Sequence, residues 1–162
     1  MFLILMGVSG SGKTTVGRLL CAQLGWPFYD ADDFHPPQNV AKMAKGIPLT
    51  EADRVPWLAK LSALIRDHIA RDDSGILACS ALSHAARAAL RVDGKRVVFV
   101  HLRGPKELIR SRLLARTDHY MPPTLLDSQF AALEDPGDEA ITIDIGPRPE
   151  AIAVDIRRRL AL

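Results

Sequence analysis

The hydrophobic positions of the chain alternate between short continuous apolar runs and longer stretches in which apolar residues recur every three or four positions. The continuous runs predict buried strands at 2–6, 27–29, 76–79, 97–102 and 140–145. The periodic stretches predict helices at 15–24, 35–45, 50–69, 84–90, 107–116, 125–133 and 150–160. Strands that alternate with helices in this way predict an α/β fold of three layers, with a parallel sheet of about five strands between helices.

Glycines and small polar residues lie between the first predicted strand and the first predicted helix. Their order, a glycine, four free positions and then Gly-Lys-Thr, is that of a phosphate-binding P-loop. Glycine lets successive N–H groups turn toward phosphate oxygens, and the start of the helix adds its positive end. Lys13 would neutralise the outer phosphates, and the hydroxyl of Thr14 has the length to reach a magnesium ion. The predicted ATP ligands are Gly7, Val8, Ser9, Gly10, Ser11, Gly12, Lys13, Thr14 and Thr15.

The P-loop refines the fold class to the P-loop NTPase type, but it does not define the reaction, because GTPases, motor ATPases and small-molecule kinases share it. The simpler alternative is a flexible glycine-serine turn before an ordinary amphipathic helix. No Asn-Lys-x-Asp guanine-binding motif is present, and the run 76–79 continues into Ser80 where GTPases and motor ATPases have an acidic residue. These differences favour a kinase.

Size and composition indicate one soluble domain. The 162 residues, of which 48% are hydrophobic and 25% charged, suffice for one core, so we expect a single domain over 1–162. The net charge of +2 is too small to imply nucleic acid, and the basic run 157–159 is interpreted either as a nucleic-acid patch or as the solvated face of the last helix. No apolar run is long enough to span a membrane and the two cysteines lack metal-ligand spacing, so we expect a cytoplasmic protein with reduced thiols.

Acidic residues follow the second predicted strand, and two arginines precede a proline-rich loop. Asp30 and Asp32 would point the same way if the backbone remains extended, so that one could orient magnesium and the other could accept a proton. Capping of the next helix is the structural alternative. Arg112 and Arg116 would fold over the phosphates as a mobile lid at about 117–123 closes, or would simply be solvated.

Several blocks resemble the small P-loop gluconate kinases, which are relatives of shikimate kinase. Besides the P-loop, the resemblance rests on blocks in the same order and register over most of the chain, namely Asp30-Ala31-Asp32, His35-Pro36, Lys42-Met43, Gly46-Ile47-Pro48-Leu49, Asp53-Arg54, Pro56-Trp57, Cys79-Ser80-Ala81-Leu82, Arg87, Gln129 and Leu133-Glu134. The resemblance implies a nucleoside-monophosphate-kinase-like fold and phosphorylation of D-gluconate by ATP with Mg²⁺, in a cytoplasmic homodimer. It also implies a helical substrate-binding segment at about 35–70.

The same resemblance implies the roles of individual side chains. Asp32 would be the base and Asp30, with Thr14, the magnesium partner, while Lys13 and Arg116 would act on the transferred phosphate. Arg54 and Arg87, and less favourably Lys42, would hold the gluconate carboxylate. The substrate hydroxyls would be held by Asp32, His35, Ser80 and Gln129. The chain departs from the family at Ser83-His84-Ala85-Ala86, where His84 could compensate for the missing lysine-rich segment.

Two other functions remain open at the level of sequence. One is a related kinase that acts on shikimate, adenylylsulfate or a nucleotide, although Cys79-Ser80-Ala81-Leu82 stands where shikimate kinases have a glycine-rich turn. The other is a regulatory module that binds a nucleotide without phosphorylating a small molecule.

Overall fold

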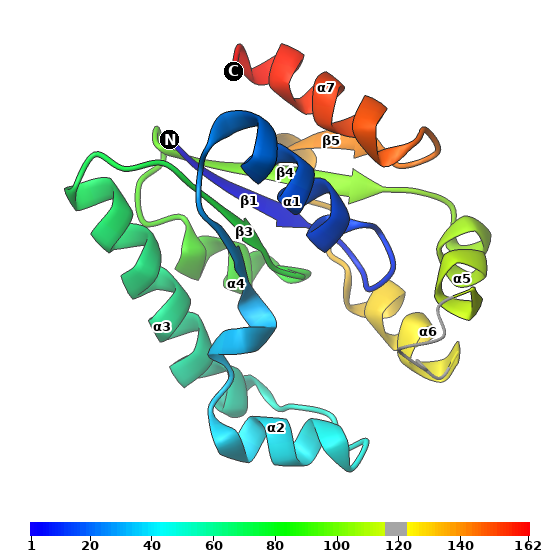
Figure 1. Ribbon diagram of the computed structural model, residues 1–162. Helices are drawn as coiled ribbons and strands as arrows, with labels where there is room; N and C mark the ends of the chain where they lie inside the picture. Colours follow the sequence, from blue (N-terminus) through cyan, green and yellow to red (C-terminus); the bar gives the residue numbers. More distant parts are fainter. Residues whose placement is uncertain (116–122) are drawn as a thin grey trace.

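A single parallel sheet forms the centre of the molecule (Figure 1). The computed structural model describes residues 1–115 and 123–162. Five strands lie in the order β2-β3-β1-β4-β5, and every neighbouring pair is parallel. The strands are β1 (Phe2–Met6), β2 (Phe28–Asp30), β3 (Gly75–Ala78), β4 (Val97–Arg103) and β5 (Ala140–Asp144). The sequence prediction of about five parallel strands is confirmed.

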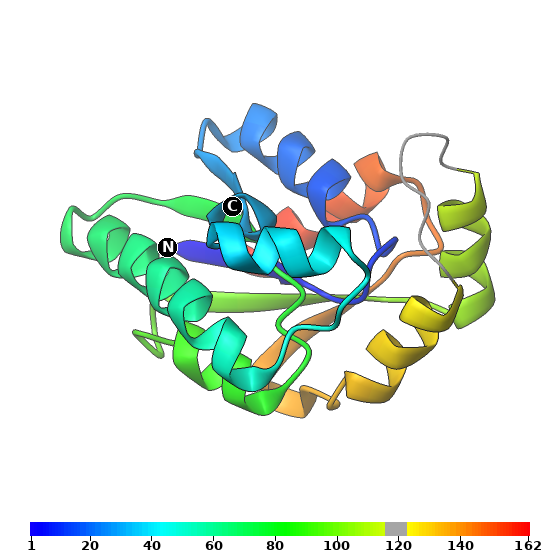
Figure 2. The same cartoon turned by 90° about the horizontal axis from the view of Figure 1, so that it is seen from below.

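Helices cover both faces of this sheet, and Figure 2 shows the three layers, with α1 and α7 on one side of the sheet and α3 and α4 on the other. The α-helices are α1 (Lys13–Leu24), α2 (Pro37–Ala44), α3 (Glu51–Ala70), α4 (His84–Leu90), α5 (Lys106–Leu114), α6 (Pro123–Ala132) and α7 (Pro149–Leu160). Two short 3₁₀ helices, η1 (Ala31–Phe34) and η2 (Gly137–Glu139), precede α2 and β5. The predicted α/β/α arrangement is confirmed.

Side chains of the central strand alternate between two separate cores, as expected for a strand buried on both faces. Leu3 and Leu5 pack with residues of α1, α5 and α7, whereas Phe2, Ile4 and Met6 pack with residues of α3 and the end of α4. All five side chains are fully buried. Strand β1 therefore holds both layers of helices, and the P-loop that follows it starts from a rigid position.

Local sequence signals define several helix ends. Thr50 and Asp53 form the predicted capping box at the start of α3, with each side chain bonded to the other residue's backbone N–H. Helix α1 begins at Lys13, two residues earlier than predicted, after Gly12 with φ of 95°. Its first turn therefore includes the amides of Lys13, Thr14 and Thr15, which have no acceptor within the helix.

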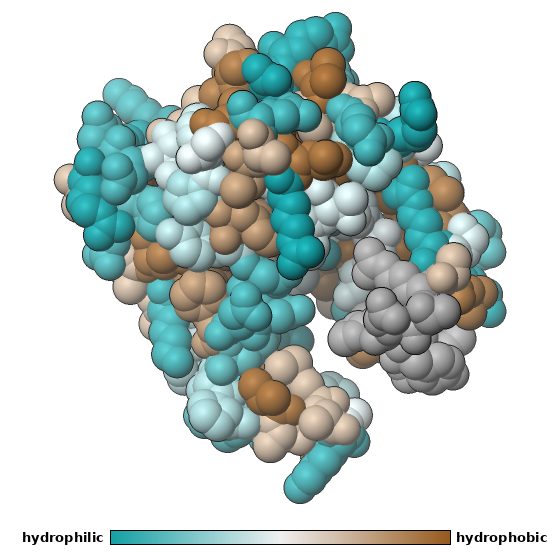
Figure 3. Space-filling model, in the orientation of Figure 1, coloured by the Kyte–Doolittle hydropathy of each residue, from teal (hydrophilic) through white to brown (hydrophobic). Residues whose placement is uncertain are grey.

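The carboxyl ends of the parallel strands lie along one edge, where ligands bind in open α/β sheets. Helix α2 projects beyond this edge on one side and α6 lies on the other (Figures 1 and 2). The space-filling view in Figure 3 is hollowed between α2 and the body of the molecule. The predicted helix at 35–45 is observed as α2 over 37–44.

Candidate active site

The P-loop has the backbone that phosphate binding requires. Gly7, Gly10 and Gly12 all have positive φ, of 140°, 82° and 95°. A Cβ on Gly10 would lie 2.7 Å from Cγ of Leu113 in α5, so a side chain cannot be accommodated there. The loop is thus tightly seated on α5, and its shape is set before any ligand arrives.

Lys13 lies along the inside of this loop. Its ammonium donates hydrogen bonds to the carbonyls of Gly7 at 2.9 Å and Val8 at 3.0 Å. The side chain therefore already curls over the space that the loop encloses. A phosphate in the loop would offer this cation a stronger, charge-assisted partner than a neutral carbonyl.

Thr14 and Asp30, the two residues expected to hold magnesium, lie side by side. The hydroxyl of Thr14 donates a hydrogen bond to Oδ2 of Asp30 at 3.1 Å. A hydroxyl and a carboxylate oxygen beside a phosphate loop are hard oxygen ligands of the kind that Mg²⁺ selects. The donor set therefore fits this ion.

The backbone does not remain extended from Asp30 to Asp32, which was the condition for the two side chains to point the same way. The strand ends at Asp30, and the chain turns at once into the 3₁₀ helix η1. Oδ1 of Asp30 accepts the N–H of Asp32 at 3.2 Å and so caps this helix. Asp30 therefore has the helix-capping role that was the structural alternative, and it also lies beside Thr14.

Asp32 lies near enough to Lys13 for their charges to interact. Loss of hydration, followed by repulsion from Asp30, raises the pKa of the Asp32 carboxyl, while His35 and Lys13 lower this pKa. Because 88% of the Asp32 side chain is solvent accessible, water limits the size of this pKa shift. A solvent-facing carboxylate with a raised pKa is well suited to accept a proton.

His35 forms the wall next to Asp32. Its ring stacks on Trp57, with centroids 4.5 Å apart and planes 11° apart, and its Nε2 lies 4.0 Å from Oδ1 of Asp32. Trp57 is buried and donates from Nε1 to the carbonyl of Ala31 at 2.7 Å, which joins α3 to η1. Burial lowers the pKa of His35; Asp32 raises this pKa and the charge of Arg54 lowers it, and the net effect is a lowered pKa. His35 is therefore neutral at pH 7 and offers one ring nitrogen as donor and one as acceptor.

Two of the predicted carboxylate ligands differ in availability. Arg54 is exposed near His35 on the first turns of α3. Lys42 instead donates to both oxygens of Asp53, at 2.7 and 2.8 Å, and this pairing lowers the pKa of Asp53 to about 2. Lys42 thus connects α2 to the capping box of α3, and Arg54 is the better placed cation.

Arg87 occupies a different place from the one expected. Its side chain is 1% exposed, and Nε donates to Oε2 of Glu139 at 2.8 Å. Nη1 donates to the carbonyls of Ala81 and Leu82 at 3.2 and 2.9 Å. Ala81 has φ of 43°, a strained value for a residue with a Cβ. Arg87 therefore holds the loop after β3 and does not face the open cleft.

The loop held by Arg87 also touches the P-loop and the region around α6. The carbonyl of Ser80 accepts the N–H of Gly7 at 3.2 Å. His84, largely exposed, donates its backbone N–H to Glu134, and its Nδ1 lies 2.6 Å from Oε1 of Glu139. The backbone of Ser80, a predicted ligand of the substrate hydroxyls, is therefore beside the phosphate loop, and His84 lies at the outer side of the Glu139 network.

The remaining predicted ligands lie on the α5 and α6 side. Gln129 bonds to Ser9 of the P-loop through both ends of its amide. Arg112 donates from Nη2 to the carbonyl of Ile145 at 2.7 Å, which joins α5 to the end of β5. Arg116 and the predicted lid up to residue 122 lie outside the described residues, and Pro123 begins α6.

The sequence analysis did not identify Glu139, nor did it identify Ser9 as the partner of Gln129. No motif marks Glu139, because its importance arises only when β5 brings it beside Arg87, 52 positions earlier. Burial raises the pKa of the Cys79 thiol to about 12, which disfavours the thiolate.

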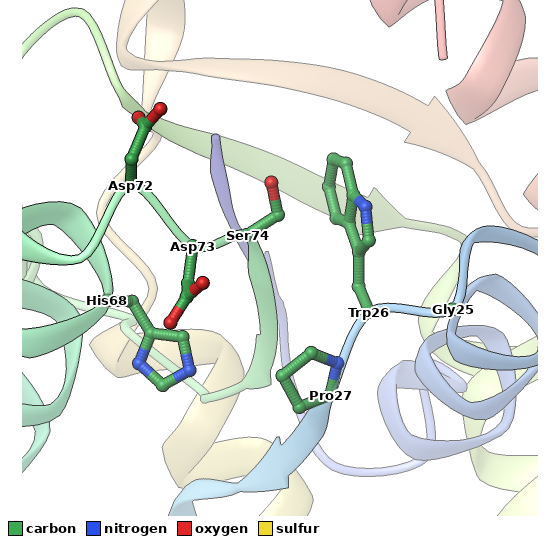
Figure 4. Close-up of a pocket in the computed structure, with 7 residues that line it drawn as sticks. All are labelled: Gly25, Trp26, Pro27, His68, Asp72, Asp73 and Ser74. Atoms are coloured by element: carbon green, nitrogen blue, oxygen red, sulfur yellow. The ribbon is translucent and has the colours of Figure 1, made fainter.

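The hollows formed by the described residues include the following two. One of about 320 Å³ is lined by Thr14, Thr15, Arg18 and Leu19 at the start of α1. The other, of about 450 Å³, lies at the amino ends of the strands and is lined by Trp26, His68 and the turn 72–74, among others (Figure 4). The carboxylates of this turn are paired, Asp72 with Arg96 and Asp73 with Arg71. The predicted site residues do not line this second hollow.

Comparisons with known proteins agree with this geometry. The shikimate kinase family matches residues 9–134. A rat protein named "Probable gluconokinase" is 47% identical over 83% of this chain and 82% of its own length. A gluconokinase of Gluconobacter oxydans is 43% identical over 97% of this chain and 89% of its own length. The crystal structure of a gluconokinase from Sinorhizobium meliloti is 38% identical, with a TM-score of 0.85 over 98% of this chain and 92% of that one. Among the helices that the structure describes, none has the length and apolar content of a membrane span.

Proposed function

The chain belongs to the gluconokinases of the shikimate kinase family, and from this premise we propose that it transfers the γ-phosphoryl group of ATP to the terminal hydroxyl of D-gluconate. The products would be 6-phospho-D-gluconate and ADP. The observation that carries the proposal is the proximity of Lys13 and Asp32, whose charges interact; Lys13 can neutralise phosphate and Asp32 can accept a proton.

The P-loop would bind the triphosphate of ATP. The N–H groups at the start of a helix can donate to phosphate oxygens, and the positive end of the helix adds to the attraction. Lys13 would leave the carbonyls of Gly7 and Val8 and follow the negative charge toward the γ-phosphate. Phosphoryl transfer depends mainly on such positioning and charge neutralisation.

Asp32 would act as the base. It would accept the proton of the gluconate hydroxyl while that oxygen forms its bond to the γ-phosphorus and the bond to the bridging oxygen of ADP breaks. A raised pKa makes this carboxylate a stronger base, and its exposure to the cleft lets a substrate reach it. Asp30 is less suited, since Thr14 and the amide of Asp32 already bond to its oxygens.

Thr14 and Asp30 would hold Mg²⁺, the first directly and the second directly or through water. When bound, such an ion screens the charge of the phosphates. Their present hydrogen bond keeps both oxygens at one place beside the loop, so that binding requires little rearrangement.

Arg54 would bind the carboxylate of gluconate, and His35 would bind a hydroxyl. Arg54 is exposed and close to His35, which favours it over Lys42 and Arg87, whose cationic groups are already bonded to Asp53 and Glu139. A neutral imidazole can donate to or accept from a sugar-acid hydroxyl. Ser80 would add a short polar group near the phosphate.

A panel of sugar acids, shikimate and nucleosides in an ADP-coupled assay tests the proposal. Gluconate should give the highest kcat/KM, whereas phosphorylation of shikimate without gluconate would contradict it. Lys13→Ala and Asp32→Asn should each remove turnover while the melting temperature stays near that of the wild type. Wild-type kcat in Asp32→Asn would contradict the assignment of the base.

We also propose that the 162 residues act as one kinase domain, with the segment at about 35–70 binding the substrate, in a cytoplasmic homodimer. The exposed apolar side chains of Val40, Met43 and Ile47 on and after α2, and of Val55 on α3, support a contact with a second copy. Light scattering coupled to size exclusion measures the mass directly, and a monomer at micromolar concentration would contradict the dimer.

A further inference from the structure

Helix α6 is joined to the P-loop by the side chain of Gln129. Oε1 of Gln129 accepts the backbone N–H of Ser9 at 2.7 Å, and Nε2 donates to Oγ of Ser9 at 3.1 Å. The two residues are 120 positions apart, so the fold itself brings them together. A backbone N–H can only donate, so the atom of the Gln129 amide that bonds to the N–H of Ser9 must be the oxygen, Oε1.

This contact leaves the phosphate cradle open. Ser9 lies before the first turn of α1, and the amides of Lys13, Thr14 and Thr15 belong to that turn. Gln129 thus bonds to a residue that precedes the helix, and its two hydrogen bonds do not involve the amides of that turn. A triphosphate and Gln129 can occupy the loop at the same time.

The P-loop is held from three directions, and Gln129 supplies the third. The N–H of Gly7 donates to the carbonyl of Ser80, and Gly10 packs against Leu113 of α5. Ser9, between these two glycines, is held by α6. Without Gln129, the peptide of Ser9 would have to find other partners, and the neighbouring glycines can rotate easily.

We propose that Gln129 is a positioning residue for nucleotide binding, which acts through Ser9, and that it is not the ligand of a substrate hydroxyl that the sequence indicated. The kinetic part of this inference rests on the proposed gluconate kinase activity. The nucleotide-binding part does not, because it concerns the P-loop and ATP alone.

Calorimetric binding of a non-hydrolysable ATP analogue with Mg²⁺, in the absence of gluconate, tests the inference. Gln129→Ala removes both hydrogen bonds and should weaken analogue binding about tenfold. Ser128→Ala is the matched control on the same helix, because the exposed Ser128 hydroxyl, among the described residues, bonds only to the carbonyl of Leu125 in its own helix. The control should bind the analogue as the wild type does.

Coupling between the two partners separates positioning from a direct role. Ser9→Ala removes one of the two hydrogen bonds, and adding it to Gln129→Ala should weaken binding no further. In steady-state kinetics, Gln129→Ala should raise KM for ATP and leave KM for gluconate unchanged. Unaltered analogue affinity in Gln129→Ala, or a rise in KM for gluconate alone, would overturn the inference.

Gln129→Glu keeps the test decisive if the alanine variant does not fold. The carboxylate can still accept from Ser9, but it adds a negative charge beside the triphosphate, so binding should fall more than tenfold at low salt and recover partly at high salt. Wild-type affinity in this variant would also overturn the inference. A chain that fails to phosphorylate gluconate but shows these losses of affinity would contradict only the proposed function.

Discussion

The ion pair between Arg87 and Glu139 gives a prediction that separates a structural role from substrate binding. Glu139→Gln keeps the size of the side chain and an acceptor for Nε of Arg87, but it removes the negative charge. Arg87 is 1% exposed, so its charge would lose its carboxylate partner in a nearly dry site. Removing one partner of a buried pair costs about 3–5 kcal/mol.

The partial exposure of Glu139 lowers this value. Its side chain is 29% exposed, and glutamine can still accept one hydrogen bond, so we expect about 2–3 kcal/mol. For a domain of this size each kcal/mol lowers the melting temperature by about 3 °C, which gives about 6–9 °C. Differential scanning calorimetry at pH 7 measures this directly. Asp67→Asn is the matched control, since Asp67 is exposed on α3 and forms no ion pair within the described part of the chain.

The pH dependence provides a second check on the same pair. The hydrogen bond from Arg87 is the main cause that lowers the pKa of Glu139 below its usual value of 4.5. A carboxyl group with a lowered pKa contributes stability above its unfolded pKa and loses it as the pH falls through its folded pKa. The difference in unfolding free energy between wild type and Glu139→Gln should therefore be full at pH 7 and shrink below about pH 4.5.

Arg87→Met provides the refuting result. If Arg87 positions the loop, this variant should melt well below the wild type, because the carbonyls of Ala81 and Leu82 lose their donor. If the melting temperature is unchanged in Glu139→Gln and Arg87→Met, and KM for gluconate rises about 100-fold in Arg87→Met, then Arg87 is instead a ligand of the gluconate carboxylate, as the sequence indicated.

Three further predictions concern the substrate, the base and the packing under the site. Arg54→Gln should raise KM for gluconate about 10- to 100-fold and leave KM for ATP unchanged; equal KM values would exclude Arg54 as the carboxylate ligand. Because the pKa of Asp32 is raised above 3.8, kcat/KM should fall with decreasing pH around a pKa above that value, and a profile that is flat down to pH 4 would contradict its role as base. Gly17→Ala places a Cβ 2.3 Å from the ring of Phe28 and should cost about 1–3 kcal/mol in thermal unfolding, whereas Gly94→Ala, in open space, should not.

The sequence predicted the elements and the P-loop well, because these depend on local patterns. Buried runs and helical periodicity define the strands and helices to within a few residues, and the capping box at Thr50 marks the start of α3. The P-loop is a continuous motif whose conformation follows from its own glycines. Each of these signals lies within about ten positions of the feature it predicts.

Features that depend on tertiary contacts could not be predicted. The backbone turn after Asp30 replaced the expected extended strand, since that side chain caps η1 itself. Arg87 and Gln129 were recognised as important, but their partners, Glu139 and Ser9, lie 52 and 120 positions away. A sequence shows that a charged or amide side chain is present, and only the fold shows which group already satisfies it.

The seating of Gly10 on Leu113 has a practical consequence for variants of this protein. The P-loop rests on a leucine of the hydrophobic core, so a substitution that shortens the Leu113 side chain would leave a cavity and loosen the loop. Such a substitution, although it touches no ligand, would lower activity as an active-site substitution does, and the loss of activity would increase with temperature. Conditional, heat-sensitive alleles are therefore to be sought in α5 as much as among the residues that touch ATP.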